Sequence, residues 1–411
     1  MLFRWKLVII IIYAGYTGGM AVYMKILLAP DSFKGTMTSI EVIDHLEQAA
    51  KRHFSQLEVV KVPIADGGEG TVDSLVMATG GEYRTVEVTG PVDGRHIQAK
   101  YGIIGGKTAV IEMAQASGII LLKPGQHNPL TATTFGTGEL IKAALDEGVR
   151  DFLIGIGGSA TNDGGIGAVQ ALGISFTDDL GMEIGFGGKE LARIIKIDLK
   201  HLDPRIAESR ITVICDVSNP LTGPKGATAV YGPQKGVTEE LFGTLEAGMK
   251  NYEKLIKEAT GLDMSAIPGT GAAGGLGAAL VAFLGAVLKP GIDTILDFVN
   301  YEKLLEGVDL VVTGEGRIDG QSVYGKVPVG IAKRSKLKNI PVAVITGGMG
   351  TDAKKVFDFG IDSIMPLINR DMTLEDALSN SEQLMLDAAD RMFRFIKIGI
   401  TINTGSGSKM G

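Results

Sequence analysis

Short apolar runs rich in β-branched residues alternate along the chain with segments whose apolar residues recur at helical spacing. Several of these runs contain no alternation of apolar and polar residues, which is typical of strands buried on both faces of a parallel sheet. Strands separated by helices in this way predict an α/β fold with a doubly wound, mostly parallel sheet. We expect strands at Ile26–Ala29, Leu57–Val62, Ala109–Met113, Phe152–Ile156, Ile211–Cys215, Leu310–Thr313 and Val342–Ile345.

Helices between these strands are delimited by residues that commonly cap helix ends. Thr38 and Glu41 have the spacing of a capping box, in which each side chain bonds the backbone N–H of the other residue, so they predict a helix start. Residues 138–147 and 239–260 have apolar residues at helical spacing. Each of these two segments is followed by a glycine, which often ends a helix. These helices fit between the expected strands, as an α/β fold requires.

The composition excludes several classes of protein. The 411 residues are 45% hydrophobic and 21% charged, the proportions of a folded chain with room for more than one domain. The net charge of −7 argues against a broad nucleic-acid-binding surface, which needs a basic excess. The single cysteine, Cys215, excludes an intrachain disulfide, and the five histidines have no metal-binding spacing, which argues against a zinc enzyme.

The two ends of the chain differ from the rest. Residues 1–23 contain an apolar stretch, Leu7–Ala14, that is short for a membrane span. We interpret residues 1–23 as an extension outside the folded protein, which would begin at Met24 and be cytoplasmic without stable membrane insertion. A signal peptide or an anchor is the alternative. The Gly/Ser-rich composition at the other end predicts a flexible tail over residues 399–411.

Glycine accounts for 58 residues and clusters after the apolar runs. In open α/β sheets, ligands bind beyond the carboxyl ends of the strands, where glycine lets the backbone turn sharply and approach a ligand. Backbone N–H groups exposed in this way can bind phosphate oxygens. Five polar, glycine-rich clusters at such places together predict a ligand site: Pro30–Gly35, Pro63–Gly70, Gly155–Gly165, Cys215–Pro220 and Thr313–Asp319.

The charged residues of these clusters suit phosphate chemistry. Lys34 and Arg317 can neutralise a phosphate or hold a carboxylate. Carboxylates beside them make sense where Mg²⁺ bridges acids and phosphates, or where one acid takes a proton from an attacking hydroxyl. The main rival is a dinucleotide-binding loop at Gly155–Ala160, but Asn162 and Asp163 would then fall in the first turn of the helix, where a carboxylate repels a pyrophosphate. A two-lobed solute-binding protein, closing on an anion without chemistry, is a further alternative.

The clusters belong to longer motifs that follow one another in a characteristic order. These motifs are Ala29–Gly35, Pro63–Leu75, Thr89–Gly94, Val110–Gly118, Phe135–Gly148, Ile154–Gly173, Cys215–Gly223, Tyr231–Gly236, Gly269–Leu280 and Val312–Pro328. On them the chain resembles the glycerate kinases of the bacterial type. The resemblance extends from Met24 to about Ile396 and leaves only the two ends outside.

The resemblance implies an ATP-dependent kinase that phosphorylates D-glycerate, usually to 2-phosphoglycerate, with Mg²⁺. It also implies two lobes with the active site in the cleft between them. One would be a flavodoxin-like domain formed by residues 24–88 and 292–398, and the other an α/β domain inserted at residues 89–291. The partner would be this small molecule rather than a nucleic acid, and a homo-oligomer is compatible with the family.

We assign roles on the assumption of in-line phosphoryl transfer, which needs positioning and charge neutralisation more than covalent chemistry. Either Asp216 or Asp163 is expected to accept the proton of the glycerate hydroxyl. The sequence does not decide between these two aspartates. Lys34 and Arg317 are expected to neutralise the charges of the phosphate and of the substrate carboxylate.

The remaining expected residues bind Mg²⁺ or line the site. Glu315 or Asp319 is expected to hold Mg²⁺, directly or through water. Lys235 either binds the ligand or belongs to a solvated surface turn, and both alternatives stay open. The residues expected to line the site are Ser32, Asp66, Gly67, Gly68, Glu69, Gly70, Gly157, Gly158, Ser159, Asn162, Asn219, Lys235 and Gly314.

Overall fold

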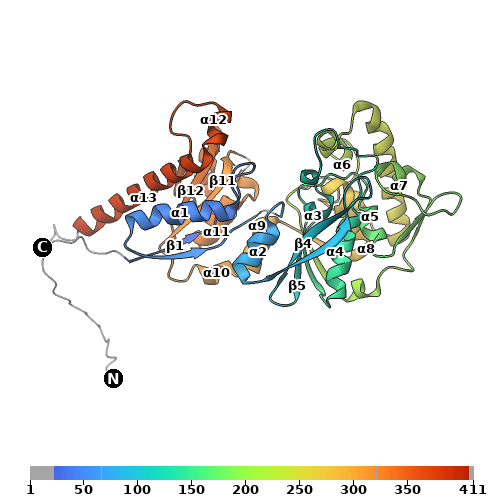
Figure 1. Ribbon diagram of the computed structural model, residues 1–411, viewed down its shortest axis with the longest axis horizontal. Coiled ribbons are helices and arrows are strands. Elements are labelled where there is room, and N and C mark those ends of the chain that lie inside the picture. The colour runs from blue at the N-terminus through green and yellow to red at the C-terminus, as the bar shows by residue number, and fades with distance from the viewer. Residues whose placement is uncertain (1–22, 66, 321, 407–411) are drawn as a thin grey trace, which may run out of the picture.

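A computed structural model describes residues 23–65, 67–320 and 322–406, which form two α/β lobes (Figure 1). Each lobe is built around its own sheet, and a two-stranded hairpin forms a third sheet. The predicted α/β fold with mostly parallel sheets is confirmed. Among the described helices, none combines the length and the apolar character that crossing a membrane requires.

The strands of the first lobe are β1 (Tyr23–Leu28), β2 (Gln56–Lys61), β11 (Leu310–Ile318), β12 (Val342–Met349) and β13 (Ser363–Pro366). They form a fully parallel sheet with the order β13-β12-β11-β1-β2. Along the chain this is the 2-1-3-4-5 order of a flavodoxin-like sheet. The chain extends the sheet from β1 to β2 and later continues it from the opposite side of β1.

The helices of the first lobe are α1 (Ser39–His53), α9 (Gly291–Phe298), α10 (Tyr301–Leu304), α11 (Val327–Lys336), α12 (Leu374–Ser379) and α13 (Ser381–Ser406). Helices α1 and α13 pack on one face of the sheet, and α9, α10 and α11 pack on the other, so both faces are buried. The predicted capping box at the start of α1 is confirmed. The Thr38 side chain accepts a hydrogen bond from the Glu41 N–H, and the Glu41 carboxylate accepts one from the Thr38 N–H at 2.8 Å.

The strands of the second lobe are β3 (Glu82–Thr89), β4 (His96–Ile104), β5 (Thr108–Glu112), β6 (Asp151–Gly155), β9 (Arg210–Ile214) and β10 (Val287–Lys289). Their order is β10-β9-β6-β5-β4-β3. The first four strands in this order are parallel, whereas β4 and β3 form an antiparallel edge. The sequence did not predict β3 and β4, because polar residues interrupt both strands and many residues of β3 are exposed, unlike the buried apolar runs.

The helices of the second lobe are α2 (Thr71–Thr79), α3 (Ala114–Ser117), α4 (Phe135–Asp146), α5 (Ile166–Gln170), α6 (Ala227–Tyr231), α7 (Glu239–Thr260) and α8 (Leu276–Leu284). The second lobe also contains the antiparallel strands β7 (Ser175–Thr177) and β8 (Lys196–Asp198), which pair with each other. Helices α4, α5, α7 and α8 contribute to the largest apolar core. Helix α7 has the bounds that the sequence predicted, and it ends at Gly261 with a positive φ of 76°.

Helix α2, which packs against β4 and β5, and strand β3 both lie in the second lobe, although the sequence placed them in the first domain. Residues 24–88 were expected in the first domain, yet residues 82–89 pair with β4 in the sheet of the second lobe. The polar pattern of β3 hides this pairing in the sequence, because an antiparallel edge strand exposes many of its side chains. The chain thus enters the second sheet before residue 89. The other limits of the two domains stay a prediction.

The two ends of the chain differ partly from expectation. Residues 1–22 lie outside the described part of the chain, so the proposed extension stays a prediction there. Tyr23 belongs to β1 and pairs with Gln56. Residues 399–406 continue α13, and Ile400 packs against the core of the first lobe. The predicted flexible tail therefore does not begin at residue 399, because the backbone is helical through residue 406.

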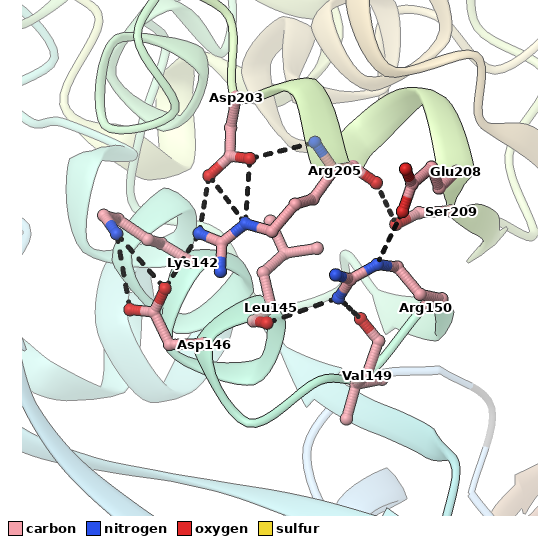
Figure 2. A network of polar contacts seen from close by, with 9 residues as sticks. All are labelled: Lys142, Leu145, Asp146, Val149, Arg150, Asp203, Arg205, Glu208 and Ser209. Atoms are coloured by element: carbon pink, nitrogen blue, oxygen red, sulfur yellow. Dashed lines mark hydrogen bonds and ion pairs between the residues drawn. The ribbon is translucent and has the colours of Figure 1, made fainter.

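A polar network on the second lobe joins α4 to a 3₁₀ turn at Pro204–Glu208 (Figure 2). The Arg205 guanidinium donates to Oδ2 of Asp203 at 2.6 Å and lies 2.8 Å from Oδ1 of Asp146. Hydrogen bonds to these two carboxylates raise the pKa of Arg205 above its ordinary value. Arg205 therefore stabilises the turn that precedes β9, the strand whose carboxyl end leads to Asp216.

Replacing Arg205 with methionine is expected to lower the free energy of unfolding by about 1 kcal/mol, because the aliphatic stem is kept while two partly exposed ion pairs are lost. Urea unfolding followed by circular dichroism measures this loss, and added salt should reduce it. The matched control is Arg210→Met, since Arg210 pairs with Asp151 while its side chain is 78% exposed. We expect no loss in the control, and an equal loss in both variants would contradict this role of Arg205.

Candidate active site

A cavity of about 430 Å³ lies where loops of the two lobes meet. Its lining follows the carboxyl ends of strands from both sheets, the place where α/β proteins bind ligands. Lys34 follows β1, and Gly67–Glu69 follow β2. Gly157–Ser159 follow β6, and Asp216 follows β9. Four of the glycine-rich clusters that the sequence singled out therefore meet at one place.

Two glycine loops of this cavity touch each other through their backbones. The carbonyl oxygen of Gly67 accepts a hydrogen bond from the Gly157 N–H at 3.4 Å. A Cβ added to Gly155 would lie 2.4 Å from that same oxygen. Gly67 itself has a φ of +89°, and a Cβ there would lie 1.9 Å from a carbon of the Ile214 side chain. Glycine is required at position 155 because a side chain there would push the two loops apart, and at position 67 because a side chain there would collide with Ile214.

Asp216 is an exposed carboxylate in the wall of the cavity. Its Oδ1 accepts a hydrogen bond from the Gly291 N–H, at the first residue of α9, at 2.6 Å. This bond ties a strand of the second lobe to a helix of the first, and the positive end of the helix favours the charged carboxylate. The neighbouring Cys215 also lines the cavity, but burial raises the pKa of its thiol, which disfavours a nucleophilic role.

Asp163, the alternative base, is completely buried and lies outside the lining of the cavity. Its Oδ2 accepts hydrogen bonds from the backbone N–H and the hydroxyl of Thr134 at 2.8 and 2.9 Å, and its Oδ1 accepts one from the Gly165 N–H at 3.0 Å. Burial raises the pKa of Asp163, and these hydrogen bonds oppose the rise. The carboxylate thus joins the start of α4 to the loop before α5. Of the two candidate bases, Asp216 is the one exposed at the cavity.

Lys235 lies in the 3₁₀ turn Pro233–Lys235 and is buried, although it contributes to the cavity wall. Its ammonium donates to the carbonyl oxygen of Thr161 at 2.7 Å. Burial lowers the pKa of Lys235 to about 7, and the charge of Asp163 opposes this shift. The alternative of a solvated surface turn is wrong for this side chain. An anionic ligand in the cavity would favour the charged form of Lys235.

Replacing Lys235 with methionine is expected to remove a pH dependence of stability. Folding lowers the pKa of Lys235 from 10.5 to about 7, so the unfolded chain binds more protons than the folded chain between these two values. The wild-type free energy of unfolding should therefore rise with pH across this interval, relative to the variant, by up to about 5 kcal/mol. Urea unfolding of both proteins across the interval measures the difference. Parallel curves for the two proteins would contradict the burial of this charge.

Arg317 lines a second cavity, of about 310 Å³, on the first lobe. Its side chain is 70% exposed, and its Nε lies 3.6 Å from Oδ2 of Asp319. Lys34 lines both cavities. The structure thus brings Lys34 together with Asp216 in the first cavity and with Arg317 in the second, whereas Arg317 and Asp216 line different cavities.

The two carboxylates predicted to hold Mg²⁺ are each engaged by other groups. Glu315 is buried, its Oε1 accepts a hydrogen bond from the Ser322 hydroxyl at 2.8 Å, and its Oε2 lies 3.8 Å from the Lys326 ammonium. Asp319 pairs with Arg317. Within the residues that the structure describes, His, Cys, Asp and Glu side chains form no group of three or more that could hold a metal ion. That Glu315 or Asp319 holds Mg²⁺, directly or through water, stays a prediction, and no step of the reaction is assigned to such an ion.

Other predicted residues shape the loops after β1 and β2. The Ser32 N–H donates to Oδ1 of Asp31 at 2.6 Å, and the Asp31 N–H donates to the carbonyl oxygen of Gly314 at 2.9 Å. These bonds hold the loop after β1 against β11. Gly70 has a φ of +90° and directly precedes α2. Asp66 lies outside the described residues, so its predicted role stays a prediction.

Asn162 and Asn219 do not line the cavity, and their side chains form hydrogen bonds with residues near it. Asn162 is buried, and its amide donates to the Thr228 hydroxyl at 3.2 Å. The Oδ1 of Asn219 accepts a hydrogen bond from the Tyr231 hydroxyl at 2.7 Å. Tyr231 itself lines the cavity. The sequence analysis did not select Tyr231, although it begins one of the motifs on which the resemblance rests.

Glu112 is a second residue that the sequence analysis missed. It is buried at the carboxyl end of β5, and its Oε1 accepts a hydrogen bond from the Val72 N–H at 2.6 Å. Burial raises the pKa of Glu112, and the bond from Val72 opposes this rise. Glu112 thus holds the start of α2, directly after the glycine loop at the cavity. The sequence contains one signal that could have identified Glu112, because it is an acidic residue at the end of an otherwise apolar run.

The fold and the cavity together define a class of protein. They describe a two-lobed α/β protein with a cavity lined by lysine side chains, a carboxylate and glycine backbone, a combination that suits an anionic ligand. Comparison with models of protein families matches residues 26–397 to the glycerate kinase family. The chain belongs to the glycerate kinase family, and the prediction of a kinase is confirmed.

Individual relatives agree with this assignment. The chain is 47% identical over 374 residues to a glycerate kinase of Haemophilus influenzae, which covers 91% of this chain and 99% of the relative. It is 45% identical over 378 residues to a glycerate 2-kinase of Escherichia coli, which covers 92% of this chain and 99% of the relative. The crystal structure of a protein assigned as glycerate kinase 2 from Salmonella typhimurium matches with a TM-score of 0.82 and 45% identity, covering 92% of this chain and 100% of that one.

Proposed function

We propose that this protein transfers the terminal phosphoryl group of ATP to the 2-hydroxyl of D-glycerate, giving 2-phospho-D-glycerate and ADP. The observation that carries the proposal is the 430 Å³ cavity in which Lys34 and the exposed Asp216 meet glycine backbone. A small anionic substrate needs local positive charge, and a hydroxyl nucleophile needs a base. The name of the Escherichia coli relative, a glycerate 2-kinase, supports the choice of hydroxyl.

In this proposal the reaction is an in-line displacement. Asp216 takes the proton of the glycerate hydroxyl, and the hydroxyl oxygen forms a bond to the γ-phosphorus of ATP. The bond between the γ-phosphorus and the oxygen that bridges to the β-phosphate breaks, and its electron pair leaves with ADP. Asp216 then releases the proton to solvent. The hydrogen bond from the Gly291 N–H keeps one carboxylate oxygen in place during these steps.

The cations and the glycine backbone neutralise charge around the transferred group. The ammonium of Lys34 balances phosphate charge at the edge of the cavity, and Lys235 faces the substrate carboxylate from the cavity wall. The loops Gly67–Glu69 and Gly157–Ser159 supply backbone donors. Mg²⁺, when bound to the nucleotide phosphates, adds further charge neutralisation. The proposal includes a cytoplasmic location and a small molecule, rather than a nucleic acid, as the partner.

The proposal is tested by ³¹P NMR of the full-length protein incubated with ATP, MgCl₂ and D-glycerate. A phosphate on C2 couples to one proton and gives a doublet, whereas a phosphate on C3 couples to two protons and gives a triplet. We expect a new doublet that grows as ADP forms. A triplet would overturn the 2-position, and the absence of any new phosphomonoester would overturn the kinase reaction on glycerate. L-Glycerate under the same conditions is the stereochemical control.

A further inference from the structure

The second cavity, of about 310 Å³, lies at the carboxyl ends of neighbouring strands of the first lobe. Its walls come from Phe33–Thr36 after β1, Gly316–Arg317 near the end of β11, Gly347–Gly348 near the end of β12, and Leu367–Ile368 after β13. Helices α12 and α13 supply the remaining wall, at the end of the first lobe where Figure 1 places α12. Four strand ends and a helix pair thus enclose one space.

The position of this space in the sheet favours a ligand. In the order β13-β12-β11-β1-β2, the chain leaves β1 on one side and returns to its other side at β11. The loops after β1 and β11 therefore diverge at this point and leave a crevice, which is where doubly wound sheets bind nucleotides. Near the end of β11, Gly316 lies beside the loop after β1, since a Cβ there would lie at ordinary contact distance, 3.8 Å from Cα of Phe33 and 3.9 Å from the Lys34 nitrogen.

The walls of the cavity are mostly apolar, with positive charge at one side. Leu374 and Leu378, on α12, line it although they are 74% and 48% exposed, so a ligand would cover apolar surface that now faces solvent. Leu384, on α13, is a buried side chain that also lines the cavity. The cationic members of the lining are Lys34 and Arg317. A flat apolar heterocycle that carries a chain of phosphates matches this combination.

The two cavities share Lys34. One of them offers the carboxylate of Asp216 and glycine backbone, and the other offers leucine side chains and Arg317. A molecule with an apolar end in the second cavity and an anionic chain would therefore pass Lys34 on the way to Asp216. This is the path that a nucleoside triphosphate needs if its terminal phosphoryl group is transferred in the first cavity.

We propose that the second cavity holds the adenine base of ATP, between Leu374 and Leu378 of α12 on one side and the loop after β1 and the end of β11 on the other, with Arg317 and Lys34 along the phosphates. This inference rests on the proposed function, because it assumes that ATP is the phosphoryl donor. It adds a binding site for the base, away from the cavity in which glycerate reacts.

The test compares Leu378→Asp with the matched control Leu180→Asp. Leu180 is 80% exposed in the region of the β7–β8 hairpin on the other lobe. Isothermal titration calorimetry measures binding of the non-hydrolysable analogue AMP-PNP and of inorganic tripolyphosphate, which has the phosphates without the base. We expect Leu378→Asp to weaken AMP-PNP binding by about tenfold or more, because a charged group replaces apolar contact with the base. Tripolyphosphate binding should stay within about twofold, and the control should match the wild type for both.

A second measurement does not depend on any variant. Photolysis of the wild-type protein with 8-azido-ATP, followed by peptide mapping, is expected to label the segment from Leu367 to Leu384. Labelling confined to peptides of the second lobe would overturn the inference. So would AMP-PNP affinity that is unchanged in both Leu378→Asp and Leu374→Asp.

The outcomes separate this inference from the proposed function. If the wild-type protein makes 2-phosphoglycerate from ATP but the variants bind AMP-PNP normally, the base lies elsewhere and only the inference fails. If the wild-type protein binds neither AMP-PNP nor 8-azido-ATP and makes no phosphoglycerate, both fail together. Loss of tripolyphosphate binding in parallel with AMP-PNP binding in Leu378→Asp would also overturn the assignment of this wall to the base.

Discussion

Replacing Asp216 with asparagine is expected to lower turnover by about 10²–10⁴-fold while the fold stays intact, because a positioned general base contributes a factor of this size. Asparagine keeps an oxygen that can accept the Gly291 N–H bond, so the loop after β9 should stay in place. It cannot take a proton from the glycerate hydroxyl. Steady-state kinetics with ATP and D-glycerate measure the loss.

The controls for this variant separate chemistry from structure. Asp179→Asn changes an exposed aspartate near the β7–β8 hairpin and should leave turnover unchanged. The thermal midpoint of Asp216→Asn should match that of the wild type, because its side chain is exposed. Normal turnover in Asp216→Asn would show that another group accepts the proton. A large rise in KM with unchanged kcat would also disagree with a role in the chemical step, because it would indicate a group that only binds the substrate.

Replacing Asp163 with asparagine is expected to lower the free energy of unfolding by about 2–4 kcal/mol. The two oxygens of the Asp163 carboxylate accept from Thr134 and from the Gly165 N–H. Asparagine has one oxygen, so at least one of these buried donors loses its acceptor. Urea or thermal unfolding measures the loss, and turnover per folded molecule should change far less than in Asp216→Asn.

The two aspartate variants form a pair with opposite expected signatures. Asp216→Asn should lose turnover and keep stability, whereas Asp163→Asn should lose stability and keep most of its turnover. If Asp163→Asn instead kept wild-type stability and lost turnover by a hundredfold or more, the proton acceptor would be Asp163. The structure favours the first pattern because Asp163 is completely buried, while Asp216 is exposed at the cavity.

Local patterns in the sequence were sufficient for the buried, parallel parts of the fold. Each of the seven expected strands overlaps a strand of the two sheets, and the capping box at Thr38 and the helix over residues 239–260 are confirmed. These signals are strong because a strand buried on both faces must be apolar throughout, and because helix caps are formed by neighbours in the chain. The edge strand β3 and its antiparallel neighbour β4 were missed, since the polar residues of β3 and of the first half of β4 resemble those of a loop.

The motifs also identified the family and most of the loops that meet at the cavity. Ligand loops of α/β sheets follow the ends of strands. The place of a glycine-rich cluster in the fold can therefore be predicted when the cluster follows an apolar run. The same reasoning could not show which acidic residue of these clusters is exposed at the cavity. Asp163 and Asp216 both lie in loops that follow a buried strand, and nothing near either residue shows which one is exposed.

The sequence by itself determined the α/β class, the family and most of the loops that meet at the first cavity, because these depend on the order of residues along short segments. Only the tertiary structure decided that Asp163 is a buried acceptor, that Lys235 lies inside the lobe, and that Lys34 borders two cavities. These properties depend on side chains and backbone brought together from distant segments, such as Thr134 around Asp163. The burial of a side chain and its hydrogen-bond partners depend on this packing, and they cannot be predicted from the residues next to it in the sequence.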